Sequence, residues 1–455
     1  MPVARSATDA QMTIDTRRRV PLPVESDPIE ALLSGRYVDR ETGEAVAVPT
    51  RSLVVAESVA GSEVDLIRGL GLGRRLALIG DERTFGALGD RVSVALAAAF
   101  DVTKIVLPGQ PHADDATVGI VRSATTSADA LIAIGSGTLN DLAKYASALD
   151  RKPYAVFATA PSMNGYTSLT ASISQHGHKL TLPAHAPLGA FFDLEVLANA
   201  PKRMIRAGLG DSICRATAQT DWLLSHLLLD MPYRQLPFDL LAEEEPALLE
   251  RAGELVRGSL DAMRVLVRTL ILSGLGTAIV GSSAPASQAE HLVSHYLDML
   301  SPADRPAVFH GEQVGVTTLS VARLQEEMLE RPPVLHPDRL TEADIVAHFG
   351  PELGRSIWPE FNAKRLDANK ADELNHRIAT GWSTIAARLS ESFLPSARIA
   401  AVLDAAAAPT TPGAIHLDRR FYESALLHAR EIRNRYTVLD VLGASGGLTQ
   451  LISTV

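Results

Sequence analysis

Three histidines and one aspartate between residues 211 and 310 have the types and spacing of metal ligands. His291 and His295 stand four residues apart, so a helix would place them on one face, and His310 opens the following segment. Asp211 lies upstream in a Gly-Leu-Gly-Asp-Ser sequence. One carboxylate with two or three imidazoles suits zinc, iron, nickel or cobalt and leaves positions open for a substrate. A single histidine is more often a hydrogen-bonded surface or core residue, so the combination carries this prediction.

A glycine-rich turn has the chemistry of a phosphate-binding site. The apolar run at 130–134 is followed by Gly135, Ser136, Gly137, Thr138 and Leu139. Glycine lets the backbone approach a phosphate closely, and the start of a following helix offers unpaired N–H groups. The spacing differs from the G-x-G-x-x-G of ordinary Rossmann proteins, so a plain tight turn between strand and helix is the alternative.

A polar loop follows the apolar run at 154–158. It extends from Thr159 to Ser168 and contains Ser162 and Asn164. Parallel α/β sheets bind ligands at the carboxyl ends of their strands, so small hydroxyl side chains here could hydrogen-bond a nucleotide. A loop that only connects two elements is the alternative.

Short apolar runs alternate with helix-length segments in the first two hundred residues. They lie at 52–56, 75–79, 104–107, 130–134 and 154–158. This alternation indicates βαβ units, so residues 31–203 are predicted to form an α/β, Rossmann-like domain with a mostly parallel sheet. Residues 1–30 mix charges and prolines without a hydrophobic period, and we expect an extended arm there.

Long helical periods replace the strand-like runs after residue 203. They lie at 205–229, 246–275, 311–330 and 419–442. An all-α domain over 204–455 is therefore predicted, with proline-rich loops at 331–337 and 408–412. The seam between the two domains, near residue 200, is the expected place for a ligand cleft.

The overall composition limits the classes of partner. The 455 residues carry a formal charge of -10, which leaves no basic surface for nucleic acid, and an anionic substrate would need a local positive site. The single cysteine, Cys214, excludes an intramolecular disulfide and favours a cytoplasmic location. No uninterrupted apolar run approaches the ~18–20 residues that span a bilayer, so we expect no membrane insertion.

The order of these motifs resembles the superfamily of iron-containing alcohol dehydrogenases, glycerol dehydrogenases and dehydroquinate synthases, and within it the sn-glycerol-1-phosphate dehydrogenases. The most specific part is the Pro-Ser-Met-x-Gly-Tyr loop at 161–166. The other segments that carry the resemblance are 37–43, 135–141, 207–211 with Asp221 and Trp222, 287–295 and 310–315. The resemblance spans residues 35–330 and assigns no motif to the last third of the chain.

This resemblance implies an NAD- or NADP-dependent dehydrogenase that needs one divalent metal, Zn, Ni or Fe, and works as a homodimer. Asp211, His291 and His310 would be the metal ligands, and Asp211 would also be a wall of the substrate pocket. His295 would lie beside the substrate, where Asn164 would also act. The implied dinucleotide contacts are Asp81, Gly135, Ser136, Gly137, Thr138, Leu139, Thr159, Ser162 and Ser168. The metal would polarise the reacting oxygen during hydride transfer.

The implied reaction interconverts sn-glycerol 1-phosphate and dihydroxyacetone phosphate, so the substrate would be a phosphorylated polyol or ketone. Two positions depart from the family pattern: Asn164 replaces an aspartate and His185 replaces a lysine that would favour an anionic substrate. A dehydrogenase of another polyol or hydroxylated metabolite is therefore the alternative. A cyclase or lyase like dehydroquinate synthase is disfavoured by the few lysines in the motifs. A non-catalytic relative would require a broken metal set, and this set is intact.

Overall fold

The computed structural model describes residues 27–452, except 176–177 and 303. Most of the expected N-terminal arm lies outside the described residues. From Pro28 to Leu33 the chain forms helix α1 (Pro28–Leu33) rather than an extended segment. Pro28 occupies the first turn, and the Asp27 carboxylate accepts a hydrogen bond from the N–H of Ile29, 2.8 Å away. The helix therefore starts with a regular N-terminal cap.

Six parallel strands form the central sheet, in the order β3-β10-β7-β6-β4-β5. Their bounds are β3 (Ser52–Ala56), β4 (Arg75–Asp81), β5 (Asp101–Leu107), β6 (Ala130–Gly135), β7 (Tyr154–Ala158) and β10 (Gly189–Asp193). All five predicted apolar runs lie in strands. The sixth strand, β10, was not predicted and lies between β3 and β7. The expected α/β class with a parallel sheet is confirmed.

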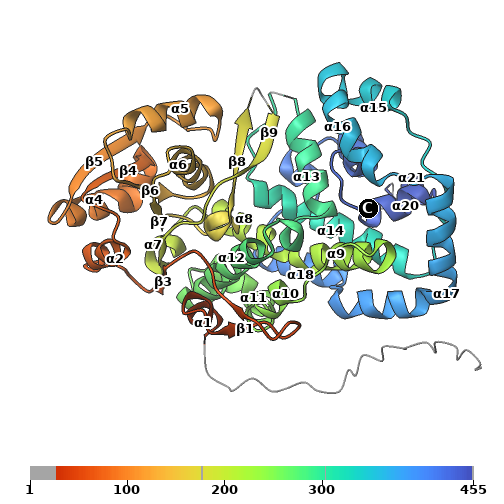
Figure 1. Ribbon diagram of the computed structural model, residues 1–455, viewed down its shortest axis with the longest axis horizontal. Helices are drawn as coiled ribbons and strands as arrows, with labels where there is room; N and C mark the ends of the chain where they lie inside the picture. The colour runs from red at the N-terminus through yellow and green to blue at the C-terminus, as the bar shows by residue number, and fades with distance from the viewer. Residues whose placement is uncertain (1–26, 176–177, 303, 453–455) are drawn as a thin grey trace, which may run out of the picture.

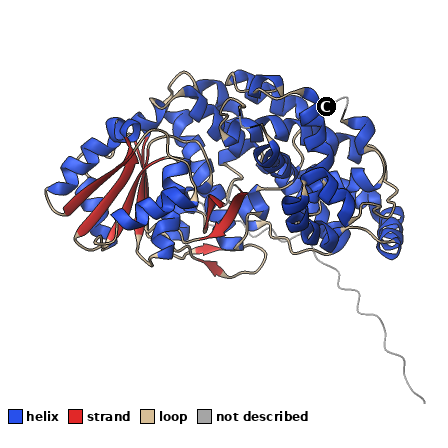
Figure 2. Cartoon of the chain, turned by 90° about the horizontal axis from the view of Figure 1, so that it is seen from above, coloured by secondary structure: helices blue, strands red, loops and turns tan. Residues whose placement is uncertain are grey.

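Alternate residues of each strand face opposite sides of this sheet, which gives two apolar layers. Leu78 and Ile132 pack with α2 (Glu63–Leu70) and α4 (Asp90–Ala97) in one buried cluster. Their neighbours on the other face pack with α6 (Gly137–Leu149) in a second cluster. Figure 2 shows helices on both sides of the sheet. The remaining helices of this part are α3 (Glu82–Thr84), α5 (Asp115–Ala124) and α7 (Leu194–Ala198).

Helices make up the second part of the chain, as predicted. Their bounds are α8 (Lys202–Ile213), α9 (Arg215–Leu229), α10 (Leu236–Asp239), α11 (Glu244–Leu255), α12 (Leu260–Val280), α13 (Ala289–Leu300), α14 (His310–Leu329), α15 (Glu342–Phe349), α16 (Pro351–Lys364), α17 (Ala368–Ser392), α18 (Ser396–Ala405), α19 (Arg419–His428), α20 (Val438–Ala444) and α21 (Leu448–Leu451). Three of the predicted stretches are interrupted. The break before α12 follows from Gly258, whose φ of +83° cannot continue a right-handed helix.

Two apolar cores hold the helical part. One core contains buried residues of α9, α13, α14, α15, α16, α17, α19 and α20. The helices α8, α11 and α12 instead share a core with the sheet, so the boundary at 203/204 stays a prediction. By length and composition α12 could cross a membrane, but 61% of its most apolar window is buried inside the protein. It is therefore a core helix that joins the two parts.

Two short hairpins complete the fold. One pairs β1 (Tyr37–Val38) with β2 (Ala45–Val46), and the other pairs β8 (Thr170–Gln175) with β9 (His178–Pro183). The second hairpin lies between the sheet domain and α13 in Figure 1, with β8 against α6 and β9 against α13. It therefore forms one wall of the space between the two parts of the chain.

Candidate metal and dinucleotide site

A cavity of about 320 Å³ lies between the α/β part and the helical part. The loops after β6 and β7, the β8–β9 hairpin and the helices α8, α13 and α14 contribute to its walls. The predicted site residues that line it are Ser136, Gly137, Thr138, Ser162, Asn164, Ser168, Asp211, His291, His295 and His310. The predicted site residues that are not part of its lining are Asp81, Gly135, Leu139 and Thr159.

Asp211 on α8, His291 on α13 and His310 at the start of α14 present their ligand atoms to one another. Asp211 Oδ1 lies 3.7 Å from His291 Nε2 and 3.9 Å from His310 Nε2. These distances are too long for hydrogen bonds, yet two atoms bound at about 2.1 Å to one ion lie at most about 4.2 Å apart. Asp211 Oδ1 is buried and accepts no hydrogen bond from the described residues, which is rare for a buried oxygen. The donor set therefore fits a divalent metal.

The second oxygen of Asp211 is held by the polar loop after β7. Its Oδ2 accepts a hydrogen bond of 2.7 Å from the backbone N–H of Asn164. Burial acts to raise the pKa of Asp211, but His291, His310 and this N–H outweigh burial and hold the pKa below its ordinary value. The carboxylate is therefore kept ionised, as a metal ligand must be.

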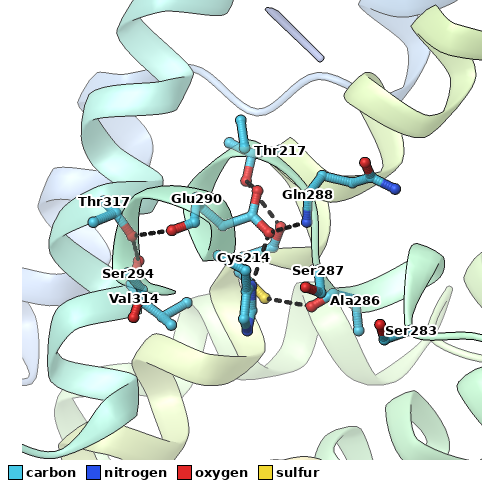
Figure 3. Close-up of polar contacts among 12 residues, drawn as sticks. Cys214, Thr217, Ser283, Ala286, Ser287, Gln288, Glu290, Ser294, Val314 and Thr317 are labelled. Atoms are coloured by element: carbon cyan, nitrogen blue, oxygen red, sulfur yellow. Dashed lines mark hydrogen bonds and ion pairs between the residues drawn. The ribbon is translucent and has the colours of Figure 1, made fainter. Parts of the chain in front are cut away.

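Glu290 orients the ring of His291, a contact that the sequence motifs did not reveal. Its Oε1 lies 2.9 Å from His291 Nδ1 and accepts from the N–H of Gln288 at 2.8 Å. Thr217 donates to the other oxygen at 3.1 Å, so both oxygens are engaged (Figure 3). A proton held on Nδ1 leaves Nε2 as the atom that faces Asp211.

The pKa of His291 is the net result of opposing effects. Burial lowers it, but the carboxylates of Asp211 and Glu290 raise it to about 9. Without a metal the ring therefore carries a second proton at neutral pH. Because a metal needs a neutral imidazole, metal binding must displace that proton.

Close backbone contact brings the helices of the metal ligands together. A Cβ atom added to Gly210 would lie 2.0 Å from the carbonyl oxygen of Gly311, and one added to Gly311 would lie 1.8 Å from that of Ala207. Any side chain at either glycine would push α8 and α14 apart. These glycines each adjoin a ligand, Asp211 or His310, so their small size sets the ligand spacing.

Asp221 fixes the start of α13, the helix that carries His291. Its carboxyl group accepts hydrogen bonds from the N–H of Ala289 at 3.3 Å and the N–H of Val438 at 3.0 Å. Burial and the nearby Glu290 raise the pKa of Asp221 to about 8. Asp221 therefore joins the beginnings of α13 and α20 in the protein interior.

His295 lies one helical turn beyond His291 and also lines the cavity. Its ring centroid is 6.1 Å from that of His291 and 6.2 Å from that of His310. It is not in the group of closely spaced ligand atoms found among the described residues. The side chain is therefore placed to contact a molecule in the cavity next to the candidate metal centre.

The glycine-rich turn presents the start of α6 to the cavity. Ser136, Gly137 and Thr138 line it, and Ser136 makes no capping hydrogen bond through its side chain. The first N–H groups of α6 are therefore available to an anion. Leu139 instead packs in the core, where it fills the space that a Cβ on Gly135 would need.

Asp81 and Thr159 have contacts other than the predicted ones. The Asp81 carboxylate accepts a hydrogen bond of 2.8 Å from the N–H of Thr84 and so caps α3. Thr159 is buried, and its N–H donates to the carbonyl of Gly135. In this structure both residues stabilise the turns at the ends of strands.

Lys144 is a buried cation that the sequence motifs did not reveal. Its Nζ donates to the carbonyl oxygens of Gly165 at 2.6 Å and Thr170 at 3.0 Å, and to Ser168 Oγ at 3.0 Å. Burial lowers the pKa of Lys144 to about 8, and Asp141 acts against this shift. Lys144 therefore ties α6 to the polar loop, and both segments contribute residues to the cavity lining.

The cavity lining contains the cation of Arg433 and does not include the residue at position 185. His185, the position at which the resemblance expects a lysine, does not line the cavity. Its Nε2 lies 3.3 Å from Ser147 Oγ, and its ring packs against Tyr154. Arg433, from the last third of the chain, does line the cavity. No sequence motif pointed to Arg433, because only the folded chain brings it there.

Comparison with known proteins identifies the family to which the chain is similar. Residues 54–201 match the protein family described as iron-containing alcohol dehydrogenase. The chain is 28% identical over 377 residues to a glycerol-1-phosphate dehydrogenase (NAD(P)+) of Geobacillus thermodenitrificans, an alignment that covers 81% of this chain and 86% of that protein. It is 32% identical over 281 residues to the protein of the same name from Thermococcus kodakarensis, covering 62% and 79%.

Solved structures share the fold at lower sequence identity. A probable glycerol dehydrogenase from Sinorhizobium meliloti 1021 superposes with a TM-score of 0.57 at 18% identity, covering 87% of this chain and 96% of that chain. A sulfoacetaldehyde reductase from Bifidobacterium kashiwanohense, solved in complex with NAD+, gives 0.60 at 12% identity, covering 90% and 97%. At these identities the likeness concerns the fold, an α/β domain followed by a helical domain.

Proposed function

Because the chain belongs to the glycerol-1-phosphate dehydrogenase family, within the iron-containing alcohol dehydrogenase superfamily, we propose that it interconverts sn-glycerol 1-phosphate and dihydroxyacetone phosphate with NAD(P). It is an NAD(P)-dependent oxidoreductase that acts on an alcohol group and uses a divalent metal. One observation supports the metal site most strongly. Asp211 Oδ1 is buried, accepts no hydrogen bond within the described part of the chain, and lies at metal-bridging distance from two imidazole nitrogens.

Asp211, His291 and His310 would hold the metal, which supplies a Lewis acid at the reacting oxygen of the substrate. Glu290 keeps the Nε2 atom of His291 directed at Asp211 through its 2.9 Å contact with Nδ1. The N–H of Asn164 holds the other oxygen of Asp211. These contacts fix the ligands before a metal binds, which limits the entropy lost on binding.

The turn after β6 would hold the dinucleotide. The N–H groups of Ser136, Gly137 and Thr138 at the start of α6 suit a pyrophosphate, because the helix dipole favours negative charge there. Ser162 and Ser168 line the same cavity and would contact the dinucleotide, although the Ser168 hydroxyl also bonds to Lys144 and to the carbonyls of Gly165 and Thr170. The nicotinamide supplies the hydride in the direction of ketone reduction.

His295 and Asn164 would contact the substrate. Reduction of the ketone consumes one hydride and one proton, and the His295 imidazole lines the cavity where it could donate that proton. The Asn164 side chain lines the cavity and can donate a hydrogen bond to a substrate hydroxyl through its amide. It lacks the negative charge of the aspartate that it replaces, so it would orient the substrate without acting as a base.

The test is the stereochemistry of the product. The enzyme is incubated with dihydroxyacetone phosphate and NADH or NADPH, and the product is offered to a dehydrogenase specific for sn-glycerol 3-phosphate. The proposal predicts NAD(P)H oxidation and a product that the second enzyme does not consume. Consumption of the product, or no oxidation with a metal-loaded protein, would contradict it.

Two further properties belong to this proposal. We expect a cytoplasmic location, in line with the single cysteine of the chain. We also expect a homodimer, by analogy with the superfamily. Size-exclusion chromatography with light scattering tests the dimer, and a single-chain mass would contradict it.

A further inference from the structure

We propose that Arg433, together with the hydroxyl groups of Thr181, Ser283 and Ser287, binds the phosphate monoester group of the substrate. This inference rests on the proposed function and adds the residue that would select phosphorylated over unphosphorylated substrates. All four residues line the cavity that also contains the metal ligands. Arg433 lies in the last third of the chain, to which no motif had been assigned.

Arg433 has no carboxylate partner within ion-pair distance among the residues described. Its Nη2 lies 3.4 Å from Thr181 Oγ1, a weak contact for an arginine. Burial lowers the pKa of Arg433, and only the more distant charge of Glu360 opposes this effect. Glu360 accepts a hydrogen bond from the N–H of Asn434 instead. A guanidinium that is partly removed from water and lines a cavity with no carboxylate within ion-pair distance among the described residues favours an anionic ligand.

A second arginine, Arg435, forms hydrogen bonds with the two serines of the proposed phosphate site. Arg435 donates to the carbonyl oxygen and the hydroxyl group of Ser287, and to Ser283 Oγ at 2.7 Å. Burial, followed by the charge of Arg433, lowers the pKa of Arg435 to about 10. The two guanidinium groups repel each other, and an anion bound between Arg433 and the serines would relieve that repulsion.

The position of Ser287 favours the substrate phosphate over the dinucleotide phosphates. Ser287 lies two residues before α13, the helix that carries the candidate metal ligand His291, and both residues line the cavity. The expected pyrophosphate position is at the start of α6, which belongs to the opposite wall. The metal would lie at the reacting oxygen, so an anion site on the same wall suits the phosphate end of a small substrate.

This assignment also explains how a chain of charge -10 could attract a phosphorylated substrate. The missing lysine at His185 leaves no cation there, and His185 is not part of the cavity lining. Arg433 supplies a local positive charge from another part of the chain. Its planar guanidinium can make two parallel hydrogen bonds to a phosphate, which lysine cannot.

The experiment compares Arg433→Gln and Arg433→Lys with the wild type, with Arg355→Gln as a control on an exposed part of α16. Steady-state kinetics are measured with dihydroxyacetone phosphate, dihydroxyacetone, NADH and NADPH, and binding of inorganic phosphate is measured by calorimetry. We expect Arg433→Gln to lower kcat/KM for the phosphorylated ketone about 10- to 100-fold, mainly through KM, with dihydroxyacetone changed less than about twofold. Phosphate binding should be lost in Arg433→Gln and weakened in Arg433→Lys.

Three results would overturn the inference. Equal losses on both ketones would mean that Arg433 has a structural role. A rise in KM for NADPH alone would assign the arginine to the 2′-phosphate of the cofactor. Unchanged phosphate binding in Arg433→Gln would remove the anion site. If the wild type reduced neither ketone but phosphate binding still depended on Arg433, the proposed function would fail while the anion site was supported.

Discussion

Replacing Gly210 by alanine should break the metal centre without touching any ligand. The new Cβ would lie 2.0 Å from the carbonyl oxygen of Gly311, and real Cβ contacts essentially never fall below 3.0 Å, so α8 and α14 must separate by at least 1.0 Å. If this movement separates Asp211 Oδ1 from His310 Nε2, now 3.9 Å apart, their distance exceeds the ~4.2 Å that one ion can bridge. We expect metal affinity to fall about 100-fold and the free energy of unfolding to fall about 1–3 kcal/mol.

The assay is competition for zinc against a chromophoric chelator, together with thermal unfolding of the metal-free protein. The matched control is Gly69→Ala in α2, where an added Cβ meets nothing within 4 Å. That change should stabilise the protein by about 0.5–1 kcal/mol, because glycine is unfavourable inside a helix. If Gly210→Ala bound zinc with wild-type affinity and unfolded at the wild-type temperature, the argument from helix contact would be wrong.

Two further predictions concern His291. Glu290→Gln should lower metal affinity about 10- to 100-fold, because an amide is a weaker acceptor for the Nδ1 proton than a carboxylate. Glu327→Gln, at an exposed position of α14, is the control and should leave chelator competition unchanged. In the metal-free protein the pKa of His291 is about 9, so a proton competes with the metal below that pH. Apparent affinity should therefore rise about tenfold per pH unit and level off above about pH 9, and a flat pH profile would contradict the assigned ligand.

The parallel sheet was largely predictable because its buried strands appear in the sequence as continuous apolar runs. Each of the five predicted runs became a strand, although β5 begins at Asp101, before the apolar part of its sequence. The strand β10 was missed, although Phe191 and Phe192 form part of a short apolar run ending at Asp193. This run has only five residues, and no obvious helix precedes it in the sequence, so it could not be distinguished from a loop. Its place inside the sheet depends on pairing with β3 and β7.

Residues of the candidate site could be predicted only where a suitable residue type also had a characteristic spacing in the sequence. His291 and His295 share a helix, so their spacing indicated a common face, and the structure places both at the cavity. Lys144 was not found because a lysine within a helix usually indicates a solvated face, whereas this one is fully buried. Arg433 was not found because its place in the cavity lining depends on how the last third of the chain packs against α13. Contacts of this kind arise only from tertiary structure.

The most direct test of the central claim measures metal content and activity on the same samples. The protein is stripped of metal and restored with zinc, nickel, iron or cobalt, and NADH and NADPH oxidation are followed with dihydroxyacetone phosphate. The account predicts that one bound metal per chain restores activity and that His291→Ala neither retains the metal nor regains activity. Full activity of the metal-free protein, or equal metal binding by His291→Ala, would contradict it.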